Sequence, residues 1–128
     1  MGSSWKLGVL AAFFLGAVTG AAVAEPCHGS IGIAKAGAAH FAIDGDKPLR
    51  VGEQTSLSIR ACASGKAPLL SFDAVMPAHG HGLNYRPELT ETEPGRWRVE
   101  GLLFHMAGRW EFRLRTVEAT GVVEQVIK

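Results

Sequence analysis

Alternation of apolar and polar side chains along short segments is the feature that most constrains this chain of 128 residues. In QTSLSIRAC, residues 54–62, Leu57, Ile59 and Ala61 fall on one face, and two serines and an arginine fall on the other. A period of two is typical of a β-strand with one buried face. The chain is therefore expected to build sheets.

Further short runs of β type follow one another with turn signals between them, about ten residues apart. They are HFAI, LLSFDAVM with Leu70, Phe72, Ala74 and Met76 inward, the polar edge strand ELTETE, PGRWRVEGLLF, AGRWEFRLRTV with Trp110, Phe112 and Leu114 inward, and GVVEQVIK. Trp97 and Trp110 are expected in the core, and Ala119–Gly121 is expected to turn the last hairpin. Because no run has a helical period, the sequence predicts an all-β, immunoglobulin-like, two-sheet β-sandwich of about seven strands.

The N-terminus has the pattern of a secretory signal. Lys6 precedes the uncharged run LGVLAAFFLGAVTGAAV, which ends in Ala-Val-Ala at Ala24. A charged start, an apolar stretch and small residues at the cleavage site define such a signal, which predicts a periplasmic or secreted protein. The alternative is an anchor formed by an uncleaved N-terminal helix, although about 17 residues is short for a bilayer span. The expected organisation is a signal peptide over 1–24, a flexible arm over 25–39 and a domain over 40–128.

Size and charge exclude several classes of function. A mature chain of about 104 residues fits one domain. The formal net charge is +1, and the lysines and arginines are scattered. Nucleic-acid binding needs a basic stripe or patch, so no nucleic-acid partner is expected, and no small-molecule substrate is indicated.

The chain has two cysteines, Cys27 and Cys62. An even pair in an exported protein predicts a disulfide. A metal or redox site that combines Cys27 and His28 with Cys62 is the alternative, but no C-x-x-C spacing supports it.

Two stretches stand out, MPAHGHG at residues 76–82 and GRWRVEGLLFHMAGRWEFRL at residues 95–114. They resemble the YtkA-like domain family, small exported or membrane-anchored bacterial β-sandwich domains. The matching positions are Met76, Pro77, Gly80, His81, Gly82, Gly95, Trp97, Met106, Gly108 and Trp110. His79 stands where the family often has methionine. The similarity covers roughly residues 54–116, and some relatives are associated with oxidase assembly or copper handling, which is an implication by association.

Histidine and methionine gather in the same two stretches. Of the five histidines three lie there, and so do both methionines that follow the signal segment. The candidate metal ligands are His79, His81, Met76, His105 and Met106. Imidazole and thioether suit copper, and soft sulfur favours Cu(I). Because His105 and Met106 are adjacent, they point to opposite faces of an extended segment, and at most one of them is expected to join.

A structural interpretation of the same residues stays open. The two methionines would pack in the core, and Gly80 and Gly82 would supply positive φ angles to the loop. Catalysis has little support: no nucleophile motif has a plausible base, and Asp73 faces outward if Phe72 faces inward. A zinc hydrolase would need three ligands and an open position, and no carboxylate is spaced as its base. The sequence thus predicts a non-enzymatic exported accessory domain that binds copper or a similar metal. The alternative is a metal-free module that contacts an envelope or membrane protein.

Overall fold

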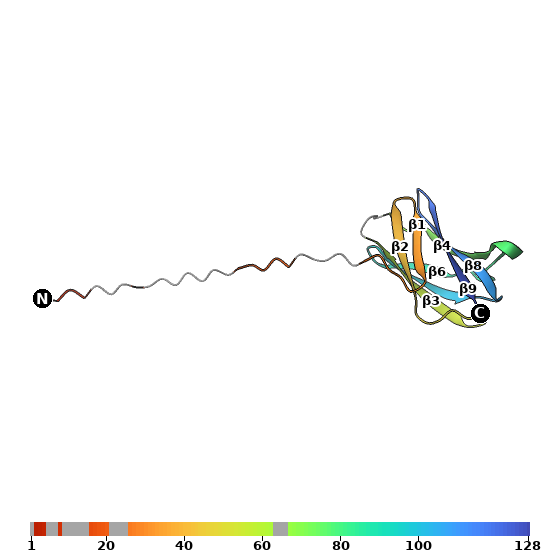
Figure 1. Cartoon of the computed structure of the whole chain (residues 1–128), viewed down its shortest axis with the longest axis horizontal. Helices are drawn as coiled ribbons and strands as arrows, with labels where there is room; N and C mark the ends of the chain where they lie inside the picture. Colours follow the sequence, from red (N-terminus) through yellow and green to blue (C-terminus); the bar gives the residue numbers. More distant parts are fainter. Residues whose placement is uncertain (1, 5–7, 9–15, 21–25, 63–66) are drawn as a thin grey trace.

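The computed structural model describes residues 2–4, 8, 16–20, 26–62 and 67–128, and it is a sandwich of two antiparallel sheets (Figure 1). One sheet has the order β1-β2-β3-β7-β6, and the other has the order β5-β4-β8-β9. The elements are β1 (Gly32–Ala36), β2 (Ala39–Gly45), β3 (Gln54–Ala61), β4 (Ser71–Met76), the 3-10 turn η1 (Pro77–His79), β5 (His81–Gly82), β6 (Glu88–Glu93), β7 (Arg96–Leu103), β8 (Gly108–Arg115) and β9 (Thr120–Ile127). The predicted two-sheet sandwich is confirmed.

The core lies between the sheets and is made by the alternating side chains that the sequence indicated. Trp110, Phe112 and Leu114 of β8 are fully buried, while Arg113 between them is exposed. Phe104 packs edge-on against Trp110, with ring centroids 5.2 Å apart. Burying one large apolar side chain contributes about 1.5–3 kcal/mol, so this aromatic layer is a main source of stability. The buried tryptophans and the polar edge strand β6 are confirmed as well.

Two strands were not expected from the sequence. β5 is a pair of residues within the histidine loop, and β1 lies inside the segment 25–39 that was expected to be a flexible arm. β1 pairs with β2, and its inward residues Ala34 and Ala36 are buried. Alanine is a weak strand former, so pairing and packing, rather than local propensity, hold this strand in place.

β1 also reaches across to the edge strand of the other sheet. The Gln125 side-chain amide on β9 donates to the carbonyl of Ile31 at 3.0 Å. A Cβ at Gly121 would lie 2.9 Å from the backbone carbonyl carbon of Lys35, so strands β9 and β1 approach each other closely at this point. This contact closes one side of the sandwich.

A β-bulge in β7 sets which residues face the core at the end of that strand. Thr55 of β3 pairs with Leu102, whereas Leu57 pairs with Val99, so β7 has one extra residue. Gly101 has a φ of +77°, which matches a bulge with glycine in the left-handed region. The bulge shifts the alternation, and Phe104 is consequently buried.

Two local predictions were wrong. Leu70 is 49% exposed, whereas its neighbour Leu69 is buried, because β4 begins only at Ser71. The last hairpin turns over residues 116–119, and Thr120 already pairs with Arg115.

The predicted disulfide between Cys27 and Cys62 is present, with Cα atoms 5.3 Å apart. Beside it, the Arg60 guanidinium donates to the carbonyls of Pro26 and His28. The chain that precedes β1 is therefore fixed to the end of β3.

Charged side chains on the outer face of the larger sheet pair with one another. Arg98 forms ion pairs with Asp46 and Glu100, and its hydrogen bond to Asp46 raises the pKa of Arg98. Asp73 on the other sheet is exposed, as the inward position of Phe72 predicted. These charged side chains therefore lie on the solvated outer faces of the two sheets.

Part of the N-terminal prediction lies outside the described residues. Most of the predicted signal segment, including Ala24, belongs to that part. In the portion of the chain that the structure describes, no helix has the length and apolar character to cross a membrane.

Candidate metal-binding face

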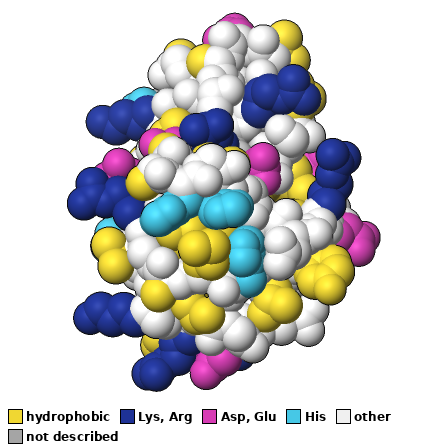
Figure 2. All heavy atoms as spheres, turned by 90° about the vertical axis from the view of Figure 1, so that its right-hand side faces the viewer, with side chains coloured by type: hydrophobic (Ala, Val, Ile, Leu, Met, Phe, Trp, Pro, Cys, Tyr) yellow, Lys and Arg dark blue, Asp and Glu magenta, His cyan; other side chains and the backbone are white. Residues whose placement is uncertain are grey.

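Three histidine side chains come together at one end of the sandwich. The rings of His79 and His81 have centroids 6.3 Å apart, and those of His81 and His105 are also 6.3 Å apart. We call these three residues the histidine face. Figure 2 shows histidine side chains gathered around an apolar patch on the side of the molecule that carries η1. The histidines that the sequence singled out in its two motif stretches are thus neighbours in space.

The turn at Gly80 places His79 and His81 beside each other. His79 ends η1, Gly80 follows with a φ of +62°, and its N–H donates to the carbonyl of Pro77. His81 then pairs with Met76. The rings lie at an interplanar angle of 22°, so one left-handed residue turns two exposed imidazoles the same way. The expectation of a positive φ is confirmed at Gly80 and wrong at Gly82.

Replacing Gly80 by alanine is expected to lower the free energy of unfolding by about 1–2 kcal/mol, because a side chain disfavours the left-handed region. Gly82→Ala is the matched control, since Gly82 has no positive φ and open space around its Cα. Urea unfolding followed by tryptophan fluorescence measures both variants. Equal stability of the two would show that the turn does not depend on glycine.

His105 is held by Trp110. The His105 ring stands edge-on to Trp110 with centroids 5.7 Å apart, and the Trp110 indole N–H donates to the carbonyl of Met106 at 3.0 Å. The turn that follows β7 is therefore attached to the core on both sides of His105. The Nδ1 atom of His105 is buried and has no hydrogen-bond partner. A buried polar atom without a partner lowers the stability of the fold by about 1–3 kcal/mol.

Met76 lies beneath the histidine face. It is buried at the end of β4 and is the register partner of His81. Directly opposed residues of an antiparallel pair project to the same side of the sheet, with Cβ atoms about 4.5–5.5 Å apart. A Cβ at Gly108, the first residue of β8, would lie 2.7 Å from the Met76 methyl carbon. The methyl end of the Met76 side chain therefore reaches the start of β8.

Met106 takes a different direction from His105. Its side chain is half-buried and packs against the core, while its carbonyl accepts the Trp110 N–H. His105, by contrast, contacts His81 and Trp110 through its ring. The expectation that at most one of the two adjacent residues joins a site stays a prediction.

The spacing of the rings limits the metal geometry that they can support. A ring nitrogen lies about 1.1 Å from the ring centre and binds a metal at about 2.0–2.1 Å, so two rings on one ion have centroids about 5 Å apart for a tetrahedral angle and about 6.3 Å for a linear one. Both measured separations lie at the linear limit. Over the described residues, no three or more His, Cys, Asp or Glu side chains form a group that could hold a metal ion. At these separations, two of the imidazoles can share one ion only in a nearly linear arrangement.

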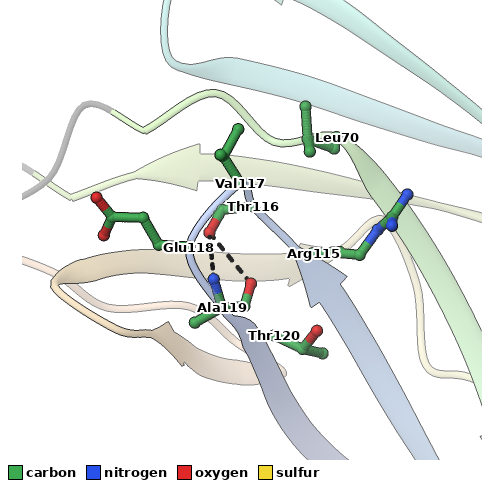
Figure 3. Close-up of a pocket in the computed structure, with 7 residues that line it drawn as sticks. All are labelled: Leu70, Arg115, Thr116, Val117, Glu118, Ala119 and Thr120. Atoms are coloured by element: carbon green, nitrogen blue, oxygen red, sulfur yellow. Dashed lines mark hydrogen bonds between the residues drawn. The ribbon is translucent and has the colours of Figure 1, made fainter.

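A hollow of about 410 Å³ lies at the other end of the sandwich, beside the turn from β8 to β9 (Figure 3). Its polar lining consists of Arg115, Thr116, Glu118 and Thr120. The Thr116 hydroxyl donates to the carbonyl of Ala119 and accepts from its N–H. Leu70 and Val117, both exposed, line its apolar side. Arg115 and Glu118 point in opposite directions in Figure 3, so these two charged side chains do not converge on one point.

Sequence reasoning missed the supporting residues of the histidine face. Trp110 was expected in the core but not as the support of His105, and the bulge at Gly101 was not foreseen. A signal for the bulge is present: inward residues fall at Trp97 and Val99, but then at Leu102 and Phe104. That change of phase is visible in the sequence.

Comparisons with protein-family models, with curated proteins and with solved structures found no match to this chain. The resemblance to YtkA-like domains therefore stays a prediction that rests on its two motif stretches.

Proposed function

We propose that this protein is an exported, non-catalytic accessory domain that binds copper at the histidine face. The observation that carries the proposal is the convergence of three imidazoles from two segments about 25 residues apart in the chain, at 6.3 Å from ring to ring. Neutral imidazole is a general ligand for copper and zinc.

The thioether favours copper over other metals. Met76 is directly opposite His81 in the sheet register, and it is the sulfur donor that we assign to the site. Soft sulfur ligands select Cu(I). Zinc prefers four tetrahedral ligands, and a catalytic zinc site keeps three protein ligands with an open position. The sequence spaces no carboxylate as the general base that a zinc hydrolase would need.

Export is supported by the N-terminal sequence and by the disulfide. A charged start, an apolar run and Ala-Val-Ala precede the domain, and a Cys27–Cys62 bridge suits an oxidising compartment. We place the protein in the periplasm or outside the cell on these grounds. An uncleaved N-terminal anchor would leave the proposed copper site unchanged.

The competing function is a metal-free module that contacts an envelope or membrane protein. It is favoured by the apolar patch among the exposed histidines (Figure 2), which is a suitable surface for a partner. Copper uptake distinguishes the two functions, because the second has no need of it.

The purified protein without an affinity tag is expected to bind copper at micromolar concentration, and His79→Ala/His81→Ala is expected to abolish stoichiometric binding. Titration with Cu(I) under ascorbate and with Cu(II) measures this, and bound Cu(II) should quench tryptophan fluorescence if it lies close. Both histidines are exposed, so the double variant should keep its stability within about 0.5 kcal/mol.

His28→Ala is the matched control. His28 is exposed and lies beside the disulfide, not on the histidine face, so its removal should leave copper binding unchanged. Failure of the unaltered protein to take up either Cu(I) or Cu(II) would reject the copper proposal. A double variant that unfolds while retaining its copper would mean that the loop is purely structural.

A further inference from the structure

The chain between the disulfide and β1 lies on the outer face of the larger sheet. We call residues 26–31 the strap. Gly29, in its middle, is buried, and a Cβ added there would lie 2.5 Å from the backbone nitrogen of Ile43. The strap ends at Ile31, whose N–H donates to the carbonyl of Ile43 at 3.0 Å. The strap therefore rests directly on the backbone of β2.

Ala42 marks what the strap covers. Its two neighbours in β2 pack in the core between the sheets, so Ala42 itself points outward. It nevertheless has no solvent exposure. Its register partner on β3 is Arg60, whose guanidinium donates to the carbonyls of Pro26 and His28. Arg60 thus holds the strap on both sides of Cys27, and the strap forms a second layer over this part of the sheet.

The two ends of the disulfide differ in their access to solvent. Cys27 is half-buried on the strap, whereas Cys62 is 4% exposed. The backbone at Cys62 is fixed on two sides, because its own N–H donates to the His40 carbonyl and the preceding N–H donates to the Gly95 carbonyl, both at 2.8 Å. Exchange with an external thiol depends on which sulfur that thiol can reach. The burial of the two residues therefore favours attack at Cys27.

We infer that Cys27 is the exchange site of this bridge, the sulfur on which a dithiol oxidoreductase of an oxidising compartment acts, while the strap shields Cys62. To open the bridge, a thiolate of the oxidoreductase bonds to the Cys27 sulfur, the bond to Cys62 breaks, and Cys62 leaves as a thiolate that takes up a proton. The second thiolate of the oxidoreductase then releases Cys27, which is protonated in turn, so the bridge is reduced and the oxidoreductase is oxidised. Closure reverses these steps, with the oxidised oxidoreductase as the electron acceptor. Neither direction involves copper.

Opening the bridge frees only the first part of the strap. The far end stays attached through Ser30, whose N–H donates to the Asp44 carboxylate at 2.7 Å and whose hydroxyl accepts the Gly45 N–H at 3.1 Å. These contacts keep the freed thiol close to its partner, which gives it a high effective concentration for closure. The bridge therefore opens and closes in the folded domain, and each opening uncovers the outer face of β2.

Single-cysteine variants test the difference in access. Cys62→Ser leaves Cys27 free, Cys27→Ser leaves Cys62 free, and the probe is dithiobis(nitrobenzoate), whose reaction with a thiol is followed by absorbance. In the folded protein, Cys27 should react within about tenfold of its rate in urea, whereas Cys62 should react at least about a hundredfold more slowly than in urea, because it waits for local opening. Circular dichroism checks that each variant is folded. Similar rates for the two thiols in the folded variants would overturn the assignment.

The unaltered protein gives a second readout that needs no variant. Brief treatment with glutathione at neutral pH, an acid quench and peptide mapping locate the first mixed disulfide. Glutathione is expected on Cys27, with Cys62 as the free thiol, and the reverse distribution would reject the exchange site.

An alanine in the strap tests the shielding of Cys62. Added to Cys27→Ser, Gly29→Ala should make Cys62 react several-fold faster, because its Cβ meets the backbone of β2 and lifts the strap. Gly82→Ala is the matched control, since a Cβ there meets open space, and it should leave the rate unchanged. Equal rates in the two double variants would overturn the shielding role given to the strap.

Discussion

Replacing Trp110 by alanine is expected to lower the free energy of unfolding by about 3–5 kcal/mol, the usual cost of truncating a large buried aromatic residue. Trp110 has no solvent exposure, and it contacts both Phe104 and His105 through its ring. Its removal would leave a cavity in the aromatic layer of β8. It would also leave the Met106 carbonyl without its indole donor. Urea unfolding followed by circular dichroism measures the loss.

A conservative variant separates the two roles of Trp110. Trp110→Phe keeps an aromatic ring in the core but removes the N–H that holds Met106, a bond with a net value of about 0.5–1.5 kcal/mol. If the hydrogen bond positions His105, this variant should stay folded and yet bind Cu(I) more weakly. Trp97→Phe is the matched control, because Trp97 packs edge-on against Phe41 and away from the histidine face. Equal copper affinity in the two phenylalanine variants would confine Trp110 to a structural role.

The sequence predicted the sandwich well where one face of a strand is buried and the other is solvated. β3 and β8 show this clearly, since Leu57 and Trp110 are buried within runs whose alternate residues are polar or charged. The prediction failed where tertiary contacts replace local preference. β1 has alanines at its inward positions and depends on its pairing with β2 and its approach to β9. Neither contact can be read from residues 32–36 alone.

The sequence predicted which residues make up the candidate site, but it did not predict how they are arranged in space. His79 and His81 were candidate ligands from the sequence, and their rings lie side by side at an angle of 22°. The position of His105 next to His81 depends on a bulge in β7 and on the start of β8, which lie in the two different sheets. Long-range packing of this kind leaves little trace in local spacing. The buried depth of Met76, by contrast, follows from its alternation with Phe72 and Ala74.

Removing the disulfide by Cys27→Ser/Cys62→Ser is expected to lower the free energy of unfolding by about 4 kcal/mol, from the chain entropy of the loop that it closes. The two cysteines are 35 residues apart in sequence, and the loop includes all of β1 and β2. In the folded state the Ser30 N–H also donates to the Asp44 carboxylate, which holds this segment on β2. Residual structure in the unfolded variant would bring the measured loss below the entropic value.

The same variant should leave copper binding unchanged, because the bridge and the histidine face lie at opposite ends of the sandwich. Gln54 at the start of β3 pairs with Leu103 at the end of β7, which puts this end of both strands next to His105. β3 then runs away from the histidines, and Cys62 follows its last residue.

Copper titration at a temperature where the variant is still folded tests this separation. Peptide mapping of the exported protein without reductant tests the bridge itself. Free thiols in that protein would remove the stabilising role of the disulfide, and a parallel loss of copper affinity would show that the two ends are coupled through the sheets.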